Sequence, residues 1–372
     1  MAKNITSVAI LSDWPLALFP ELKPGPKIKV KQASPAPASA LGPGPLPNVL
    51  RLHLNSSDEN PHLASGKCMV DISKAAGLLS HLPNLHTLQI RGGHNSLTAA
   101  QVHACRPKLG NVTSLFLNAA SEPALRDLVL CCNPNKLEDF QFVIPPGNTG
   151  KLRNGTDLYG ERIVDILTQY GVADTLENLY IDTSHCDLLA FGRGLIRDSF
   201  QTVTTLSHFT SLRHLSVSAD NIYFPSLYPR VLLRDPNTGD EHNGERLVRL
   251  LPCNLESLEI KGVYAVHPTD LVSLAEASVT GGRFEELHKV VLFGDKAFTE
   301  LTEEEELPYP VPSEEGDAEL EDWHELEKRA KDIGPQINSD VRTEFDKAGI
   351  DFEFDMPEFY VAFYTADWDD EP

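Results

Sequence analysis

The chain has 372 residues, of which 41% are hydrophobic and 23% are charged. This length and composition predict a globular protein with a sizeable core and exclude a disordered chain. No apolar run approaches the roughly 18 to 20 residues that cross a bilayer, so we expect no membrane-spanning segment and no membrane partner.

The net charge of −22 is concentrated in one block of the chain. Residues 300–372 contain 25 acidic and 5 basic residues, whereas residues 1–299 contain 29 acidic and 27 basic residues. This distribution predicts no nucleic-acid partner, because affinity for nucleic acid comes mainly from lysine and arginine that neutralise phosphates. The acidic block either keeps the chain solvated or attracts a basic partner surface.

The chain opens with a predicted strand at Ser7–Leu11 and continues into residues 15–47, which contain nine prolines. Proline removes backbone donors and favours extended structure, so this stretch is predicted to be a loop or stiff linker. The alternative is a polyproline ligand for an SH3-like partner. Because Asp13 and Pro15 interrupt the first apolar stretch, it is a poor secretory leader, and we expect a cytoplasmic or nuclear location.

Eight copies of one leucine-rich frame follow between residues 46 and 292. The full frame is L-x-x-L-x-x-L-x-L, as in Leu82-x-x-Leu85-x-x-Leu88-x-Ile90. Its last part is a short strand with alternating faces, so the leucines point inward and the residues between them point outward. The first inward strand residues of the eight copies are Leu52, Leu88, Leu115, Phe140, Leu179, Leu215, Leu258 and Val290.

Amphipathic stretches of helical period lie between the predicted strands. They cover residues 71–82, 159–170 and 268–277, and Thr269 or Asp270 is the predicted cap of the last one. A single strand-and-helix unit cannot bury its apolar face alone. Stacking such units side by side makes a parallel sheet with the helices as an outer layer.

On these frames the chain resembles a leucine-rich-repeat protein over roughly Val49 to Leu292. The resemblance implies an α/β leucine-rich-repeat solenoid, with parallel strands on one face and helices on the other. The copies are 25 to 43 residues apart, more than the roughly 20 to 29 of regular families, so we expect an irregular solenoid with insertions. The family's asparagine ladder is expected to be absent, because its eight positions hold Ser57, Gly93, Ala120, Pro145, Ser184, Asp220, Val263 and Asp295.

The long helical spacers and Leu-x-x-Leu-x-Leu strands resemble most closely the irregular repeats of fungal F-box-type proteins. The segment from Val341 to Phe354 is similar to the helix-then-strand unit that ends such arrays. F-box proteins also carry a segment, typically beginning Leu-Pro-x-Glu, that docks on the adaptor of a cullin ligase, and none is recognisable here. The resemblance therefore implies, as an alternative function, F-box-like substrate recognition in ubiquitin-dependent turnover, with a cullin-ligase adaptor as partner.

This organisation predicts four segments. They are an N-terminal strand and Pro-rich segment (1–48), an irregular solenoid (49–299), an acidic disordered insertion (300–322) and a C-terminal helix-strand cap with an acidic tail (323–372).

Motifs of catalytic or cofactor chemistry are missing from the sequence. It contains no Gly-x-Gly-x-x-Gly, Walker loop, Gly-x-Ser-x-Gly or His-Glu-x-x-His, so we predict no enzyme, no cofactor and no metal site. His53, His86 and His214 fall inside repeat frames and are predicted at exposed strand or turn positions. The cysteines are predicted to be buried, reduced and small apolar groups: Cys68, Cys105, Cys131, Cys132, Cys186 and Cys253. An enzyme of unknown class is the least favoured alternative.

The outward positions of the predicted strands form the candidate binding surface. They are polar at most places, with Phe116, Tyr180 and Phe293 as large exceptions. Aromatic residues and arginine dominate the energy of many interfaces. The sequence therefore predicts a protein-binding face, with the partner-binding residues His53, Gln89, Arg91, Phe116 and Tyr180. In the alternative, an inserted loop covers Phe116 and Phe293.

Overall fold

A computed structural model shows how the repeat frames are arranged. It describes residues 7–11, 29–31, 46–55, 79, 81–91, 97–118, 122–143, 160–183, 202–222, 244–261, 268–279, 281–293 and 337–355. Among these residues, no helix combines the length and the apolar character that a membrane span requires.

The described strands form one sheet of eleven strands, and the order of the strands follows the chain from β3 to β11. Over that range each strand pairs with the next in parallel, β1 pairs with β3 in parallel, and β2 pairs with β1 in antiparallel orientation. The strands are β1 (Ser7–Leu11), β2 (Lys29–Lys31), β3 (Arg51–Asn55), β4 (Thr87–Arg91), β5 (Ser114–Asn118), β6 (Asp139–Val143), β7 (Asn178–Asp182), β8 (His214–Ser218), β9 (Ser257–Lys261), β10 (Lys289–Phe293) and β11 (Asp351–Asp355).

The strands pair in the register that the leucine frames predict. Leu52 lies opposite Leu88, and Leu88 lies opposite Leu115. The same column continues through every strand to Val290 and then Phe352. All eight predicted strands are therefore confirmed, with their inward residues aligned across the sheet.

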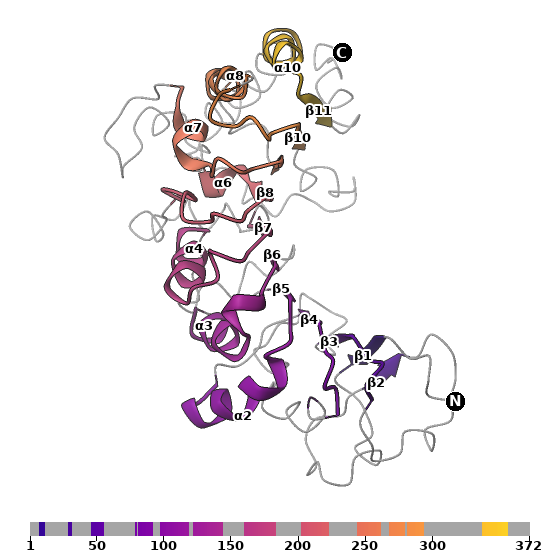
Figure 1. Ribbon diagram of the computed structural model, residues 1–372. Helices are drawn as coiled ribbons and strands as arrows, with labels where there is room; N and C mark the ends of the chain where they lie inside the picture. The colour runs from indigo at the N-terminus through magenta and orange to yellow at the C-terminus, as the bar shows by residue number, and fades with distance from the viewer. Residues whose placement is uncertain are drawn as a thin grey trace, which may run out of the picture.

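Helices line one side of this sheet, so the chain has an α/β fold with a parallel sheet. Figure 1 shows the strands as a row from β1 to β11, with the labelled helices α2, α3, α4, α7 and α8 along one side. The helical segments are α2 (Ala99–Leu109), α3 (Glu122–Cys131), α4 (Gly160–Gln169), α6 (Ala219–Ile222), α7 (Arg246–Leu250), α8 (Pro268–Ala277) and α10 (Arg342–Ala348), with short turns at Pro134–Lys136 and Ile337–Val341. Their apolar side chains and the inward strand residues form one continuous core.

Two of the three predicted helices are confirmed, as α4 and α8. The third, at residues 71–82, lies mostly outside the described residues. The predicted cap of α8 is wrong, because the helix already begins at Pro268. Proline suits a first helical position, where its missing N–H costs no hydrogen bond. Asp270 is instead buried in the first turn, where it accepts a hydrogen bond from the Arg246 N–H at 3.1 Å.

Both predicted end units belong to the sheet. Ser7–Leu11 is strand β1, and the helix-then-strand unit near the C-terminus is α10 followed by β11, as predicted. The left-handed conformation of Gly349, with φ 77°, ends α10 and turns the chain into β11. The prediction of a loop over residues 15–47 is wrong at Lys29–Lys31, because these residues form the edge strand β2. Residues 300–322 lie outside the described residues.

A ladder of polar side chains stabilises the turns that lead into the strands. In five of the frames, a side chain just before the second frame leucine donates a hydrogen bond to a backbone carbonyl of the preceding frame. The donor–acceptor pairs are Asn84–Pro47 (2.9 Å), Asn111–Pro83 (3.2 Å), Thr175–Pro134 (2.6 Å), Ser211–Asp174 (2.6 Å) and Asn254–Thr210 (2.7 Å). The frames are thus linked before their strands begin.

Candidate functional site

The side of the sheet opposite the helices, here called the sheet face, presents rows of outward side chains. The middle residue of each strand from β3 to β11 contributes to one row, because neighbouring strands pair without offset. This middle row reads His53, Gln89, Phe116, Gln141, Tyr180, Ser216, Glu259, Val291 and Glu353. Except for Val291, which is buried, its members are partly or fully exposed.

The structure brings four of the five predicted partner-binding residues into the middle row. The His53 ring and the Gln89 side chain are hydrogen-bonded to each other across β3 and β4. Phe116 follows on β5, and Tyr180 lies two strands further, on β7. Since neighbouring strands are about 4.8 Å apart, the four residues cover about 19 Å of the sheet face. Arg91 takes the next outward position of β4, and its side chain lies outside the described residues.

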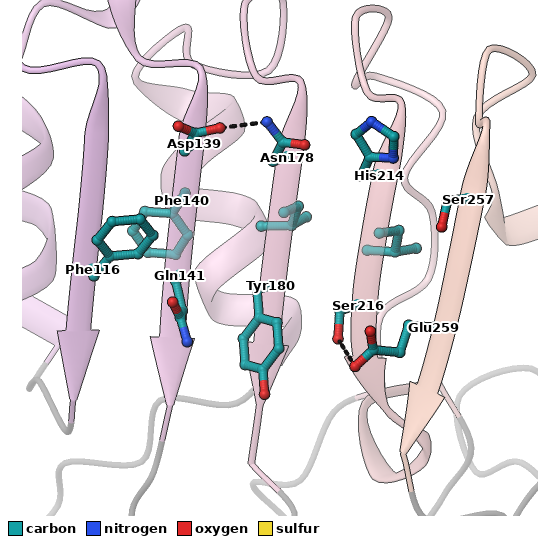
Figure 2. Close-up of a pocket in the computed structure, with 12 residues that line it drawn as sticks. Phe116, Asp139, Phe140, Gln141, Asn178, Tyr180, His214, Ser216, Ser257 and Glu259 are labelled. Atoms are coloured by element: carbon teal, nitrogen blue, oxygen red, sulfur yellow. Dashed lines mark hydrogen bonds between the residues drawn. The ribbon is translucent and has the colours of Figure 1, made fainter. Parts of the chain in front are cut away.

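A hollow of about 280 Å³ lies at the centre of the sheet face, over β5 to β9. Figure 2 shows the Phe116 ring and the Tyr180 ring on either side of Gln141, with Ser216 and Glu259 further along the row. Small serines at Ser216 and Ser257 deepen the hollow between larger neighbours. Whether a loop covers Phe116 and Phe293, as the alternative predicted, concerns residues outside the described ranges.

Sequence reasoning selected Phe116 and Tyr180 but missed the rest of the hollow. Four of the missed lining residues are the first residues of their strands, namely Asp139, Asn178, His214 and Ser257. The other six are middle residues (Gln141, Ser216 and Glu259) and inward residues (Phe140, Leu179 and Leu215). The same two-residue alternation that makes the middle residue point outward also applies to the first residue, so the signal was present. What the alternation does not show is which outward positions surround a depression.

Hydrogen bonds across the strands fix the two carboxylates of the hollow. Asp139 accepts a hydrogen bond from the Ser114 hydroxyl at 2.5 Å and another from the Asn178 amide. Glu259 accepts one from the Ser216 hydroxyl at 2.9 Å. A carboxylate has about four acceptor positions, so both groups keep capacity for a further donor.

A tyrosine, a carboxylate and a lysine form a cluster beside the hollow. The Lys261 ammonium on β9 reaches over β8 to the Tyr180 hydroxyl and to the Asp182 carboxylate, the latter at 3.0 Å. Its distance to the nearest Glu259 oxygen is 4.0 Å. Ser218, on the intervening strand β8, has a small side chain that leaves room for the Lys261 side chain to reach across.

Burial and charge shift the proton affinities in this cluster. Burial raises the pKa of the Tyr180 hydroxyl, and the adjacent lysine opposes that shift only in part. Burial alone would lower the pKa of Lys261, but the Asp182 carboxylate and the Tyr180 hydroxyl outweigh it and raise that pKa. Both shifts favour a charged Lys261 beside a neutral Tyr180. The hydrogen bonds of the Tyr180 hydroxyl with Asp182 and Lys261 hold the ring in place.

A second hollow, of about 430 Å³, lies on the helix side over α4. Its described lining is mainly charged and polar, including Glu161, Arg162 and Asp165, and contains no phenylalanine, tyrosine or tryptophan. Glu161 is already held by the Thr204 N–H and hydroxyl, at 2.9 and 2.8 Å. Its described lining therefore lacks the aromatic groups that anchor protein interfaces.

The prediction of exposed strand or turn positions is confirmed for two of the three histidines. His86 and His214 are exposed, whereas His53, in the middle row, is half-buried against Gln89. Within the described ranges, no group of three histidine, cysteine, aspartate or glutamate side chains is placed to hold a metal ion.

Three cysteines are buried, as predicted. A hydrogen bond with the Cys131 thiol lowers the pKa of Cys105 to about 7, and the same bond together with burial raises the pKa of Cys131. Burial raises the pKa of Cys132 to about 12. The prediction is wrong for Cys253, which is exposed in a turn. Cys68 and Cys186 lie outside the described residues.

Comparison with known proteins adds no functional assignment: no protein-family model matches the chain, and no curated protein matches it significantly.

Proposed function

We propose that this chain is an irregular leucine-rich-repeat solenoid that acts as a non-enzymatic protein-binding module, and that its partner contacts the sheet face. The observation that carries the proposal is the middle row, where aromatic and polar side chains lie open around a central hollow. The repeat frames, their common register and the strand order along the chain support the solenoid. Among repeat folds, such a continuous sheet surface is an extended binding surface.

The shape of the hollow favours a protein side chain over a small-molecule substrate. Pockets for small molecules usually bury most of the surface of their ligand. The hollow is open along the sheet, so it accommodates side chains of a partner and does not enclose a whole metabolite. Tyr180 and Phe116 are rigid, amphipathic or apolar anchors of the kind that dominate interface energies.

Affinity capture from the chain's own cells tests this function. Tagged protein carrying Tyr180→Ala with Arg91→Ala is expected to lose its partner, with an affinity at least about thirtyfold lower, because truncated anchors cost about 2 kcal/mol or more. Arg162→Ala, on the exposed side of α4, is the matched control and should capture the partner like the unmodified chain.

A thermal melt must first show that each variant is folded. If Tyr180→Ala fails to fold, Gln89→Ala with Phe116→Ala probes the same row. Full capture by a folded row variant would contradict the proposal. A cullin-ligase adaptor among the captured proteins would instead favour the F-box-like alternative.

A further inference from the structure

The chemistry of the hollow specifies the kind of partner that it fits. Of its twelve described lining residues, two are carboxylates, Asp139 and Glu259, and none is lysine or arginine. The lysine beside it, Lys261, lies closer to Asp182 than to Glu259. The lining therefore carries negative charge beside two aromatic rings. Carboxylates and aromatic faces are the two groups that bind a guanidinium, through charged hydrogen bonds and through stacking.

From this we infer that the hollow binds a basic, extended segment of a protein partner, whose arginine side chains contact Asp139 and Glu259 and stack on Phe116. This inference rests on the proposed function and adds the chemistry of the partner. An anionic ligand is disfavoured by the same two carboxylates. The chain's own residues 300–372 are disfavoured as occupant as well, because they carry 25 acidic and only 5 basic residues.

The sheet geometry sets the spacing of the arginines. Asp139 is the first residue of β6 and Glu259 the middle residue of β9, so the two lie about 14 Å apart across the sheet and about 7 Å apart along the strands, or about 16 Å in all. An extended peptide advances about 3.4 Å per residue, so positions i and i+4 are about 14 Å apart and point to the same side. A segment that crosses the strands can place two arginines, four positions apart, at the two carboxylates, because the long arginine side chains span the remaining distance of about 2 Å.

One of the two aromatic rings is open to an arginine in the same arrangement. Phe116 and Tyr180 stand two strands apart, about 10 Å, with Gln141 between them. The Lys261 ammonium already lies over the Tyr180 ring, 4.4 Å from its centroid, and the hydroxyl contacts with Asp182 and Lys261 hold that ring in place. An arginine that reaches Asp139 therefore stacks on Phe116.

Fluorescence anisotropy with labelled synthetic peptides tests the inference on the full-length chain. The first peptide is a glycine- and serine-based decamer with two arginines four positions apart. In the second peptide, glutamine replaces both arginines, and in the third the two arginines are adjacent. We expect the first peptide to bind more tightly than the other two, and more weakly as salt is raised.

Charge-removing variants locate the binding. Asp139→Asn with Glu259→Gln should weaken binding of the first peptide about tenfold or more, because two charge-assisted contacts are lost. Glu353→Gln is the matched control, since Glu353 belongs to the same row but lies on β11, outside the hollow. It should change binding less than twofold.

Three results would overturn the inference: equal binding of the arginine and glutamine peptides, equal binding of the spaced and adjacent arginines, or unchanged binding to the Asp139→Asn, Glu259→Gln variant. The last result would place the peptide outside the hollow. None of these outcomes depends on the capture experiment. The variant with Tyr180→Ala and Arg91→Ala could lose its partner while none of the peptides binds. That combination would support the sheet face as a binding surface but contradict an arginine-bearing partner.

Discussion

Phe140→Ala is expected to lower the free energy of unfolding by about 3–5 kcal/mol, the usual cost of removing a buried phenylalanine. Phe140 is 1% exposed at the centre of the inward column, opposite Leu115 on one side and Leu179 on the other. The cavity left by this change would be bordered by β5, β7 and the helix layer. These elements cannot close the cavity without shifting the register of the strands. Chemical denaturation followed by circular dichroism measures the change.

The control for this prediction is the next residue along the same strand. Gln141 points to the sheet face, so Gln141→Ala should change the free energy of unfolding by no more than about 0.5 kcal/mol. Equal losses for Phe140→Ala and Gln141→Ala would mean that the two faces of β6 are wrongly assigned.

Asn221→Ala is expected to cost about 2–4 kcal/mol, because it leaves several buried polar groups without their partner. The Asn221 side chain is 1% exposed and accepts hydrogen bonds from the Gly160 N–H and the Thr183 hydroxyl, both at 3.1 Å. Its amide donates to the Ser218 hydroxyl at 2.6 Å. One side chain thus joins the start of α4 to the ends of β7 and β8. Chemical denaturation measures this loss as well.

A double-mutant cycle with Gly160 gives this prediction a sharp signature. A Cβ atom at position 160 would lie 2.5 Å from the Asn221 Oδ1 atom, so Gly160→Ala should be strongly destabilising in the otherwise unmodified chain. The Asn221→Ala change removes the two closest of these contacts, with Oδ1 and Cγ, and leaves the Asn221 Cβ at 2.9 Å, so the clash is smaller in that background. The double variant should therefore be clearly more stable than the sum of the two single effects predicts. Strict additivity would show that Asn221 does not pack against Gly160.

Periodicity made the α/β fold, its eight central strands and their inward residues predictable. Alternation of apolar and polar residues fixes which side of a strand is buried, and one residue of slip would reverse it. The register was predictable as well, because neighbouring strands carry the same frame and pair at equivalent residues, as Leu88 does with Leu115. The predicted range of α8 was right, but its predicted cap was wrong, because Thr269 and Asp270 were weighted as caps over Pro268 as a first helical residue.

Contacts between residues far apart in the chain could not be predicted in the same way. The pairs Gly160–Asn221 and Tyr180–Lys261 are separated by 61 and 81 residues, and no local pattern links them. Likewise, Asp139 and Glu259 became members of one hollow only once three strand pairings had placed them on one surface. The alternation indicated which positions face outward. Where the sheet face is hollowed depends on the sizes of neighbouring side chains, which come from other frames.

Site-specific photo-crosslinking tests most directly whether the partner contacts the sheet face. A photoreactive amino acid is placed at Gln141, in the middle row, or at Asp165, on the exposed side of α4, and each chain is irradiated in its own cells. We predict a crosslinked partner from position 141 and none from position 165. A partner that crosslinks from position 165 and not from position 141 would contradict binding through the sheet face.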